Sequence, residues 1–172
     1  MKQQTLHVPE KKVVGITAWT SYENEINPDK AKISPCVARY FKEQTASTIP
    51  HVTDPSTTLC GFTDYEESWT SRDACDYKGS YTYFIGQEVS CVDKIPDGLK
   101  VLTIPAQTYV KFTTDPGPTP QIIINAWMSI WQLSPKQLGG VRSWKTDFEC
   151  YDERVYDPEN AVIDIYIGID PS

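Results

Sequence analysis

Residues that bind metals or carry redox chemistry are scarce in this chain. Histidine occurs only at His7 and His51. The five cysteines stand far apart and include no C-x-x-C pair: Cys36, Cys60, Cys75, Cys91 and Cys150. These spacings indicate neither a metal site nor a redox motif. We therefore expect no metal, and free thiols in a reducing compartment.

Long apolar runs are missing as well. No segment approaches the length that a bilayer-spanning helix needs. The N-terminal residues MKQQTLHVPEKK also lack the apolar stretch of a signal peptide. We therefore expect a cytoplasmic protein that does not interact with membranes.

Positive charge is in short supply. The chain has 16 Lys and Arg against 23 Asp and Glu, a net charge of −7. Because an acidic surface repels phosphate backbones, we expect no direct binding to nucleic acid. The motifs G-x-S-x-G, G-x-x-x-x-G-K-[ST] and G-x-G-x-x-G are absent too, so no catalytic residue and no cofactor are assigned.

Aromatic side chains, in contrast, are plentiful. The 172 residues include ten Tyr, five Trp and five Phe, together 12% of the chain. Such residues fill cores, but they also line ligand pockets. With 40% hydrophobic residues the chain has enough apolar side chains for one core of ordinary size. We expect residues 1–172 to form a single domain.

The predicted elements follow one order twice. After a polar lead-in at residues 1–12, the order strand–helix–strand–strand occupies about 13–91 and recurs in about 97–170. Strands are predicted at 12–22, 59–66, 80–91, 99–113 (with a break at Pro105), 143–154 and 161–170. Helices are predicted at 29–44, beginning near Ser34 as a cap, and from Thr119, a cap with Pro120 in the first turn, to Leu133.

The last predicted strand shows which of its faces is buried. Its isoleucines alternate onto one side and should meet the helices: Ile163, Ile165, Ile167 and Ile169. We therefore predict an α+β fold of two tandem strand–helix–strand–strand repeats with pseudo-twofold symmetry. Its antiparallel sheet should carry the helices on one face, with a ligand groove between the halves.

A carboxylate near the end of the chain has two interpretations. In the segment from Thr146 to Tyr151, Glu149 and Tyr151 share one face, and Phe148 and Cys150 take the other. Glu149 is then either a solvent-facing residue of a strand or a buried anchor for a ligand cation among aromatic rings. Strand parity alone leaves both interpretations open.

The order of seven segments resembles the GyrI-like effector-binding domains of AraC-type and multidrug-sensing regulators. The resemblance covers nearly the whole chain, although no single segment is diagnostic. The segments are VVGITAWTSYENE (13–25), AKISPCVARYFKEQ (31–44), YTYFIGQEV (81–89), IPDGLKVLTIPAQTYVKF (95–112), INAWMSIW (124–131), DFECYDER (147–154) and AVIDIYIGI (161–169).

This resemblance implies a pocket between two tandem units for a small cationic or amphipathic, drug-like ligand. It also implies a central acidic residue, matched here by Glu149. From position and strand parity, the aromatic residues expected to line the pocket are Trp19, Tyr22, Tyr109, Trp127, Trp144 and Tyr151. Each of these residues could instead belong to the hydrophobic core, and this alternative applies most to Trp127.

The regulators in this family carry a DNA-binding domain beside the effector module. Here only about a dozen residues precede the first expected strand, so we expect the chain to sequester a compound or to act with a separate regulator. A dimer is a further expectation. Two alternatives from other classes stay open: a hydrolase of cyclopropane-bearing compounds with Glu149 as general base, and an inhibitor that binds a protein partner through the acidic segment 64–77.

Overall fold

The structure, a computed structural model, describes residues 1–70 and 79–171. Its strands are β1 (Lys2–Val8), β2 (Lys11–Ser21), β3 (Thr58–Thr63), β4 (Ser80–Val89), β5 (Lys100–Ile104), β6 (Gln107–Thr113), β7 (Gly140–Arg142), β8 (Thr146–Tyr151) and β9 (Asp164–Pro171). The longer helices are α2 (Ile33–Lys42) and α5 (Gln121–Trp131). Single turns form α1 (Tyr22–Glu25), α3 (Thr45–Thr48), α4 (Glu67–Thr70), α6 (Pro135–Leu138) and η1 (Glu153–Val155). None of the helices in these two ranges is long and apolar enough to cross a membrane.

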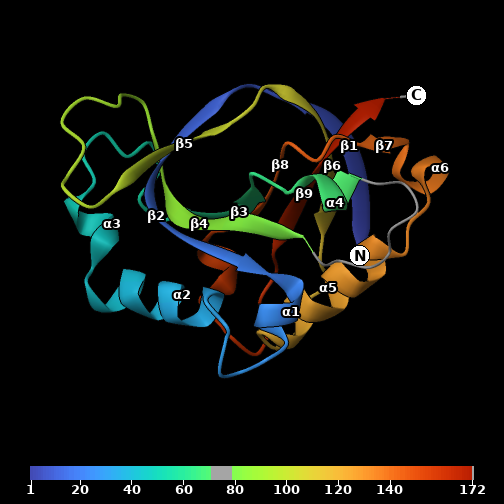
Figure 1. Cartoon of the computed structure of the whole chain (residues 1–172), viewed down its shortest axis with the longest axis horizontal. Helices are drawn as coiled ribbons and strands as arrows, with labels where there is room; N and C mark the ends of the chain where they lie inside the picture. The colour runs from blue at the N-terminus through green and yellow to red at the C-terminus, as the bar shows by residue number, and fades with distance from the viewer. Residues whose placement is uncertain (71–78, 172) are drawn as a thin grey trace.

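The strands form one antiparallel sheet in the order β1-β6-β9-β8-β3-β4-β2-β5, with β7 paired to β9 (Figure 1). Two units, β2-α2-β3-β4 and β6-α5-β8-β9, take symmetric places in this order. From the centre of the sheet outward, the first unit contributes β3, β4 and β2, and the second unit contributes β8, β9 and β6. In both units the order is therefore second, third and first strand. The second strands, β3 and β8, pair at the centre, where Cys60 lies opposite Glu149. The predicted duplicated architecture is confirmed.

Both long helices lie on one face of the sheet (Figure 1). Helix α5 covers the second unit, where Ala126, Trp127 and Ile130 belong to the same buried cluster as the isoleucines of the last strand. Helix α2 covers the first unit with Cys36 and Tyr40. The predicted isoleucine face is confirmed, because all four side chains are at most 1% exposed: Ile163, Ile165, Ile167 and Ile169.

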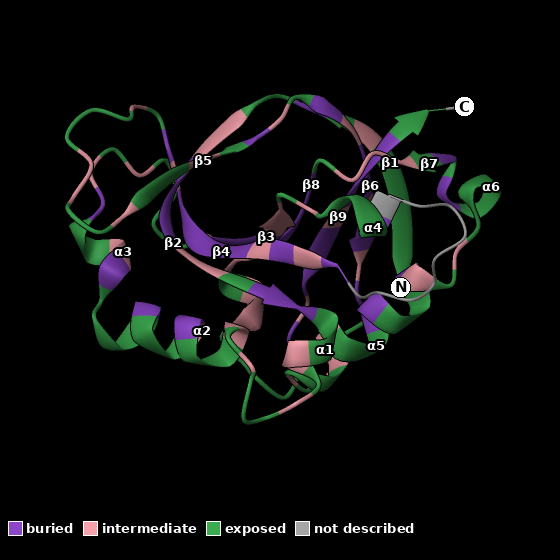
Figure 2. Cartoon of the chain, viewed as in Figure 1, coloured by how far each residue is buried: buried purple, intermediate pink, exposed green. Residues whose placement is uncertain are grey.

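The opposite face of the sheet carries a core of its own. Seven strands contribute one buried residue each to this cluster: Val8, Val13, Leu59, Phe84, Ile104, Tyr109 and Phe148. The Phe148 ring also stacks on Tyr166, with ring centroids 4.3 Å apart. Figure 2 shows much of the central strands β4 and β8 as buried. The face of the sheet centre that points away from the helices is therefore closely packed, which fixes the position of the central strands.

Two strand predictions need correction. Residues 1–12 are more than a lead-in, because β1 pairs with β6 from Lys2↔Thr113 to Val8↔Gln107. Most side chains of β1 are exposed, so this edge strand lacks the apolar alternation that sequence analysis detects. The strand predicted at 99–113 is broken at Pro105, as predicted. Its two parts, however, lie toward opposite ends of the sheet, with β5 on β2 and β6 between β1 and β9.

Both predicted helix caps are wrong. Helix α2 begins at Ile33 with Lys32 at the cap position, so Ser34 lies inside the first turn. Its free N–H groups find another acceptor, because the Glu25 carboxylate accepts hydrogen bonds from the backbone N–H of Lys32 and Ile33. Helix α5 has Pro120 at the cap position and no side-chain cap bond.

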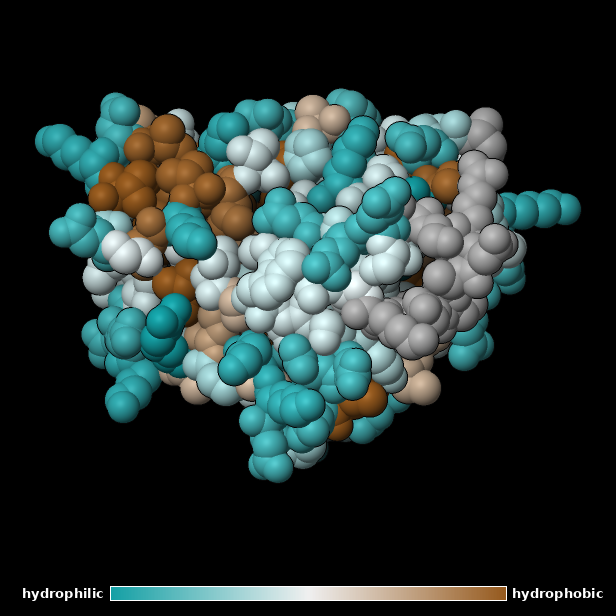
Figure 3. All heavy atoms as spheres, viewed as in Figure 1, coloured by the Kyte–Doolittle hydropathy of each residue, from teal (hydrophilic) through white to brown (hydrophobic). Residues whose placement is uncertain are grey.

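The surface seen in Figure 3 is hydrophilic over much of its area, with an apolar area near β5 and the loop before it. Val92 and Val101 are among the exposed apolar residues of this region, at 42% and 44%. Strand β5 ends the sheet order, so this area lies at an edge of the fold.

The isoleucine face predicts a large cost for removing one of its members. Ile167→Ala leaves a cavity beneath α5 and is expected to lower the free energy of unfolding by ~2–5 kcal/mol. Urea denaturation with linear extrapolation measures this loss. Val141→Ala is the control, because Val141 is 40% exposed on β7 and should lose less than ~1 kcal/mol. Equal losses for the two variants would contradict the assignment of this face as core.

Candidate functional site

A cavity of about 1030 Å³ lies between the two long helices and the sheet centre. Its floor comes from three central strands, with side chains Thr58, Cys60 and Phe62 of β3, Tyr81, Tyr83 and Ile85 of β4, and Glu149 and Tyr151 of β8. Its walls come from the helices, with Tyr22 and Glu25 of α1, Ile33, Val37 and Phe41 of α2, and Ile123, Ile124, Trp127, Met128 and Trp131 of α5. The volume is sufficient for a drug-sized molecule.

Short helix α1 extends this wall beyond α2. The Tyr22 ring meets the Trp131 ring of α5 edge-on, with centroids 5.6 Å apart. The two helix-bearing units therefore come together at the cavity, as the duplicated fold predicts.

Glu149 occupies the floor of the cavity and is only 4% exposed. It belongs to a row of facing residues that crosses six strands: Phe112, Ile165, Glu149, Cys60, Ile85 and Ile16. Every other member of the row is uncharged. The carboxylate is therefore the one charge in an apolar stripe, close to the junction of the two units.

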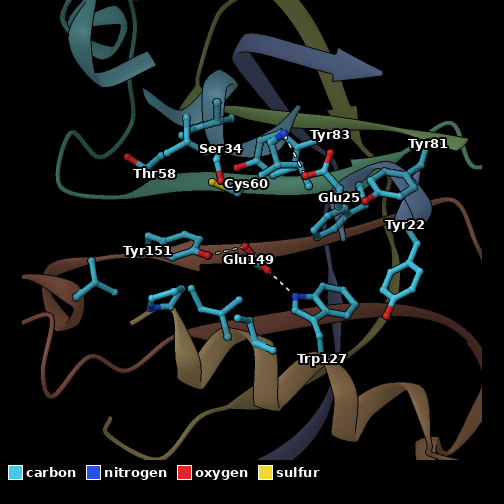
Figure 4. A pocket seen from close by; sticks show the side chains of 18 of the residues that line it. Tyr22, Glu25, Ser34, Thr58, Cys60, Tyr81, Tyr83, Trp127, Glu149 and Tyr151 are labelled. Carbon is cyan, nitrogen blue, oxygen red and sulfur yellow. Dashed lines mark hydrogen bonds between the residues drawn. The ribbon is translucent and has the colours of Figure 1, made fainter. Parts of the chain in front are cut away.

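Two neutral donors hold this carboxylate, as Figure 4 shows. The indole N–H of Trp127 donates to Oε1 at 2.5 Å, and the Tyr151 hydroxyl donates to Oε2 at 2.6 Å. Among the described residues, Glu149 has no cationic partner. The group is oriented on both oxygens while its charge stays uncompensated.

Burial is the main influence on the titration of this group. It raises the pKa of the Glu149 carboxyl above its ordinary value, and the hydrogen bonds from Tyr151 and Trp127 offset this in part. A cation placed beside the carboxylate would favour the charged form and lower the pKa again.

Aromatic rings surround the anchor. The Phe62 ring lies 5.1 Å from Trp127, 5.8 Å from Tyr83 and 5.6 Å from Tyr81, centroid to centroid, each at a steep interplanar angle. Rings in such arrangements offer both faces and edges to a guest. A cation bound at Glu149 would lie among π-faces that attract it further.

A second carboxylate near the cavity is paired. Asp147 is 1% exposed and accepts hydrogen bonds from the Tyr65 hydroxyl, from Arg142 Nη2 and from the Gly168 N–H. The Arg142 guanidinium also lies 3.8 Å over the Trp144 ring. This cluster is a buried ion pair that neutralises the charge of Arg142, which lines the cavity. The Arg142 Nε has no hydrogen-bond partner among the described residues.

Four of the seven site residues predicted from the sequence line the cavity: Tyr22, Trp127, Glu149 and Tyr151. Their clustering follows from strand parity on β8 and from the apolar face of α5. Trp127 contributes both to the core and to the anchor, since it is 9% exposed and bonds to Glu149.

The other three predicted residues do not contribute to the described lining. Tyr109 points to the opposite face of the sheet, where its ring meets Phe148 at 5.3 Å. Trp19 is 55% exposed on β2, because its neighbour Ala18 takes the helix-covered face. Trp144 lies in the loop before β8 and packs on Tyr65 and Trp69.

Sequence reasoning missed several lining residues, chiefly Glu25, Phe62, Tyr81, Tyr83 and Arg142. A signal was present for two of them. Tyr81 and Tyr83 alternate with Thr82 and Phe84 along β4, on the same face as Ile85. No comparable pattern marks Glu25, whose place depends on how α1 packs.

The cavity offers no cluster of metal ligands. Within residues 1–70 and 79–171, no group of three or more His, Cys, Asp or Glu side chains is placed to hold an ion. The chemistry of the cavity is that of an apolar, aromatic container with acidic groups.

Comparison with known proteins agrees with this geometry. Residues 6–169 match the family described as integron-associated effector binding protein. This chain belongs to that family. A putative transcriptional regulator, YobU of Bacillus subtilis, is 24% identical over 163 residues, which cover 95% of this chain and 94% of YobU.

Solved structures show the same effector-binding fold. An integron cassette protein from the mobile metagenome of Vibrio cholerae superposes with a TM-score of 0.71 at 21% identity, over 98% of this chain and 95% of that protein. The protein SAV2435, solved with bound tetraphenylphosphonium, gives a TM-score of 0.73 at 16% identity, over 99% and 94%. The predicted resemblance to GyrI-like effector-binding domains is confirmed.

The buried carboxyl of Glu149 leads us to predict a specific pH dependence of the free energy of unfolding. Because burial raises the pKa of Glu149 in the folded state, above about 4.3 in the unfolded chain, the native state binds the proton more tightly. The free energy of unfolding of the wild type should therefore fall relative to that of Glu149→Gln as the pH rises from about 4 through the folded-state pKa. Urea denaturation at a series of pH values measures the difference.

The matched control is Glu153→Gln, which removes an exposed carboxylate from η1 outside the cavity. This variant should follow the wild type at every pH. The raised pKa would be contradicted if the free energies of unfolding of wild type and Glu149→Gln differed by the same amount at every pH. It would also be contradicted if the wild type became more stable relative to the variant as the pH rises.

Proposed function

We propose that this protein binds small organic cations in the cavity between α2 and α5, with Glu149 as the anchor. The observation that carries the proposal is the buried carboxylate, held on both oxygens by neutral donors and without a cationic partner in the described chain. The neighbour SAV2435, with its bound tetraphenylphosphonium, supports the same class of ligand.

The energetics favour a cation over a neutral guest. An ionised carboxylate in an apolar site costs several kcal/mol unless a partner compensates it. A ligand cation removes this cost, and each aromatic face that it contacts adds ~0.5–2 kcal/mol. A neutral ligand gains only the apolar contacts.

The arrangement of Glu149 supports binding more than hydrolysis. Both carboxylate oxygens accept hydrogen bonds from neutral side chains, Trp127 of the cavity wall and Tyr151 of the floor. These hydrogen bonds lower the pKa of the carboxyl and so weaken it as a general base. The donors Trp127 and Tyr151 fix a charge in place, which is what an anchor requires.

The biological role that fits such a module is to sense or sequester a cytoplasmic compound. The name of the relative YobU, a putative transcriptional regulator, supports a link to transcription control. The net charge of −7 argues against direct contact with DNA, so we propose that any such control passes through a partner protein.

Tetraphenylphosphonium is a suitable first probe. Titration followed by intrinsic Trp fluorescence should show saturable quenching, because Trp127 lines the site, and thermal unfolding should shift upward with ligand concentration. Glu149→Gln keeps the shape of the side chain but removes its charge. It is expected to weaken binding by ~2–5 kcal/mol, the usual effect of losing one member of a buried charge pair.

Glu153→Gln again serves as the control and should bind like the wild type. The proposed anchor would be refuted if Glu149→Gln bound with unchanged affinity. It would also be refuted if the wild type bound none of a panel of lipophilic cations.

A further inference from the structure

The charged groups that line the cavity do not balance. Four of the described lining residues carry charge: Glu25, Arg142, Glu149 and Asp152. Arg142 is paired with the buried Asp147 at 2.5 Å. Asp152 has a partner in Arg154, at 2.7 Å.

Glu25 and Glu149 have no cationic partner among the described residues. Within residues 1–70 and 79–171, the cavity therefore presents two carboxylates without a compensating cation.

These two carboxylates enter the cavity from different elements (Figure 4). Glu149 rises from β8 in the sheet floor, while Glu25 comes from α1 in the wall. Glu25 is half-buried and fixed in place by three donors: the Thr20 hydroxyl at 2.5 Å and the backbone N–H groups of Lys32 and Ile33 at 2.9 and 3.3 Å. None of these donors carries a positive charge.

Aromatic rings line the space between the two acidic groups. From Glu149 the contacts pass to Trp127, from Trp127 to Phe62 at 5.1 Å, and from Phe62 to Tyr81 at 5.6 Å. Both Glu25 and Glu149 act electrostatically on the Tyr81 hydroxyl, whose pKa is raised first by burial and then by these two charges. An apolar surface thus connects one carboxylate with the other.

We infer that Glu25 is a second cation anchor and that the preferred ligands of the cavity are elongated dications, with two positive groups joined by an apolar or aromatic spacer. This inference rests on the proposed function of the cavity and extends it. One positive group lies at Glu149, the spacer lies along Trp127, Phe62 and Tyr81, and the second positive group lies at Glu25. A monocation of the same length leaves Glu25 uncompensated.

Two series of probes test this inference: bis(trimethylammonium) alkanes of increasing spacer length, and alkyltrimethylammonium ions of the same lengths. In the wild type we expect one spacer length to be optimal, with that dication bound at least about tenfold more tightly than its monocation, as is typical of an added charge pair. Affinity that rises steadily with chain length in both series, with no advantage for dications, would overturn the inference. This comparison uses only the unaltered chain.

Variants of helix α1 then test whether Glu25 binds the second positive group of the dication. Glu25→Gln keeps one of the two oxygens that accept from the backbone N–H groups of Lys32 and Ile33. It should remove the advantage of the dication, while the affinity for the monocation changes by less than about twofold. Glu23→Gln, an exposed site on the same helix α1 and outside the cavity, should behave as the wild type. Equal weakening of both probes in Glu25→Gln would show that Glu25 acts only on structure and would overturn its role as an anchor.

The proposed function and this inference can fail separately. If monocations bind in a manner that depends on Glu149, and dications gain nothing, only the second anchor is refuted. If neither series binds, or if Glu149→Gln binds both as the wild type does, the proposed function fails and the second anchor fails with it.

Discussion

Hydrogen bonds from Trp127 and Tyr151 hold Glu149 at the centre of the molecule, and the bond from Trp127 joins the helix layer to the sheet. One donor comes from helix α5 and the other from the same strand as the acceptor, and together they occupy both carboxylate oxygens. Neither donor supplies charge, so the fold orients the anion without compensating it. Such a group is costly to ionise when the cavity is empty. The same cost favours any guest that brings a positive charge.

The rest of the architecture keeps this group in place. The duplicated units meet at β3 and β8, and Glu149 lies in that central pair opposite Cys60. On the reverse face, the adjacent Phe148 is stacked on Tyr166 and packed into the second core. Close packing on that side prevents β8 from relaxing. A sheet closely packed on that face therefore presents a rigid floor, while the helices provide the walls.

The sequence was sufficient to predict the duplicated fold because each unit shows its own periodicity. The alternating isoleucines of β9 identified the face beneath α5. The parity of β8 separated Glu149 from Phe148 but left its environment open, and only the family resemblance placed the carboxylate in a pocket. Strand parity predicts which residues of a strand share a face of the sheet, but not which of the two faces carries the helices. It could therefore not predict the site fully. Trp19 and Tyr109 take the opposite face for that reason.

Other features depend on contacts between distant segments and have no local signal. Edge strand β1 is polar, and only its pairing with β6 defines it. Glu25 reaches the cavity because a loop folds α1 against the first turn of α2, which no spacing in the sequence reveals.

Proton release on ligand binding is the most direct measurement of the central claim, that a cation compensates the buried charge of Glu149. Calorimetric titration with tetraphenylphosphonium in buffers of different ionisation enthalpy gives the number of protons released at each pH. Burial raises the pKa of the Cys60 thiol and of the Tyr83 and Tyr151 hydroxyls, so these groups do not titrate near neutral pH. The account predicts proton release by the wild type at pH values between the pKa of Glu149 in the complex and its raised pKa in the empty protein, and loss of this release in Glu149→Gln. Binding without proton release at any pH, or equal release by the variant, would contradict it.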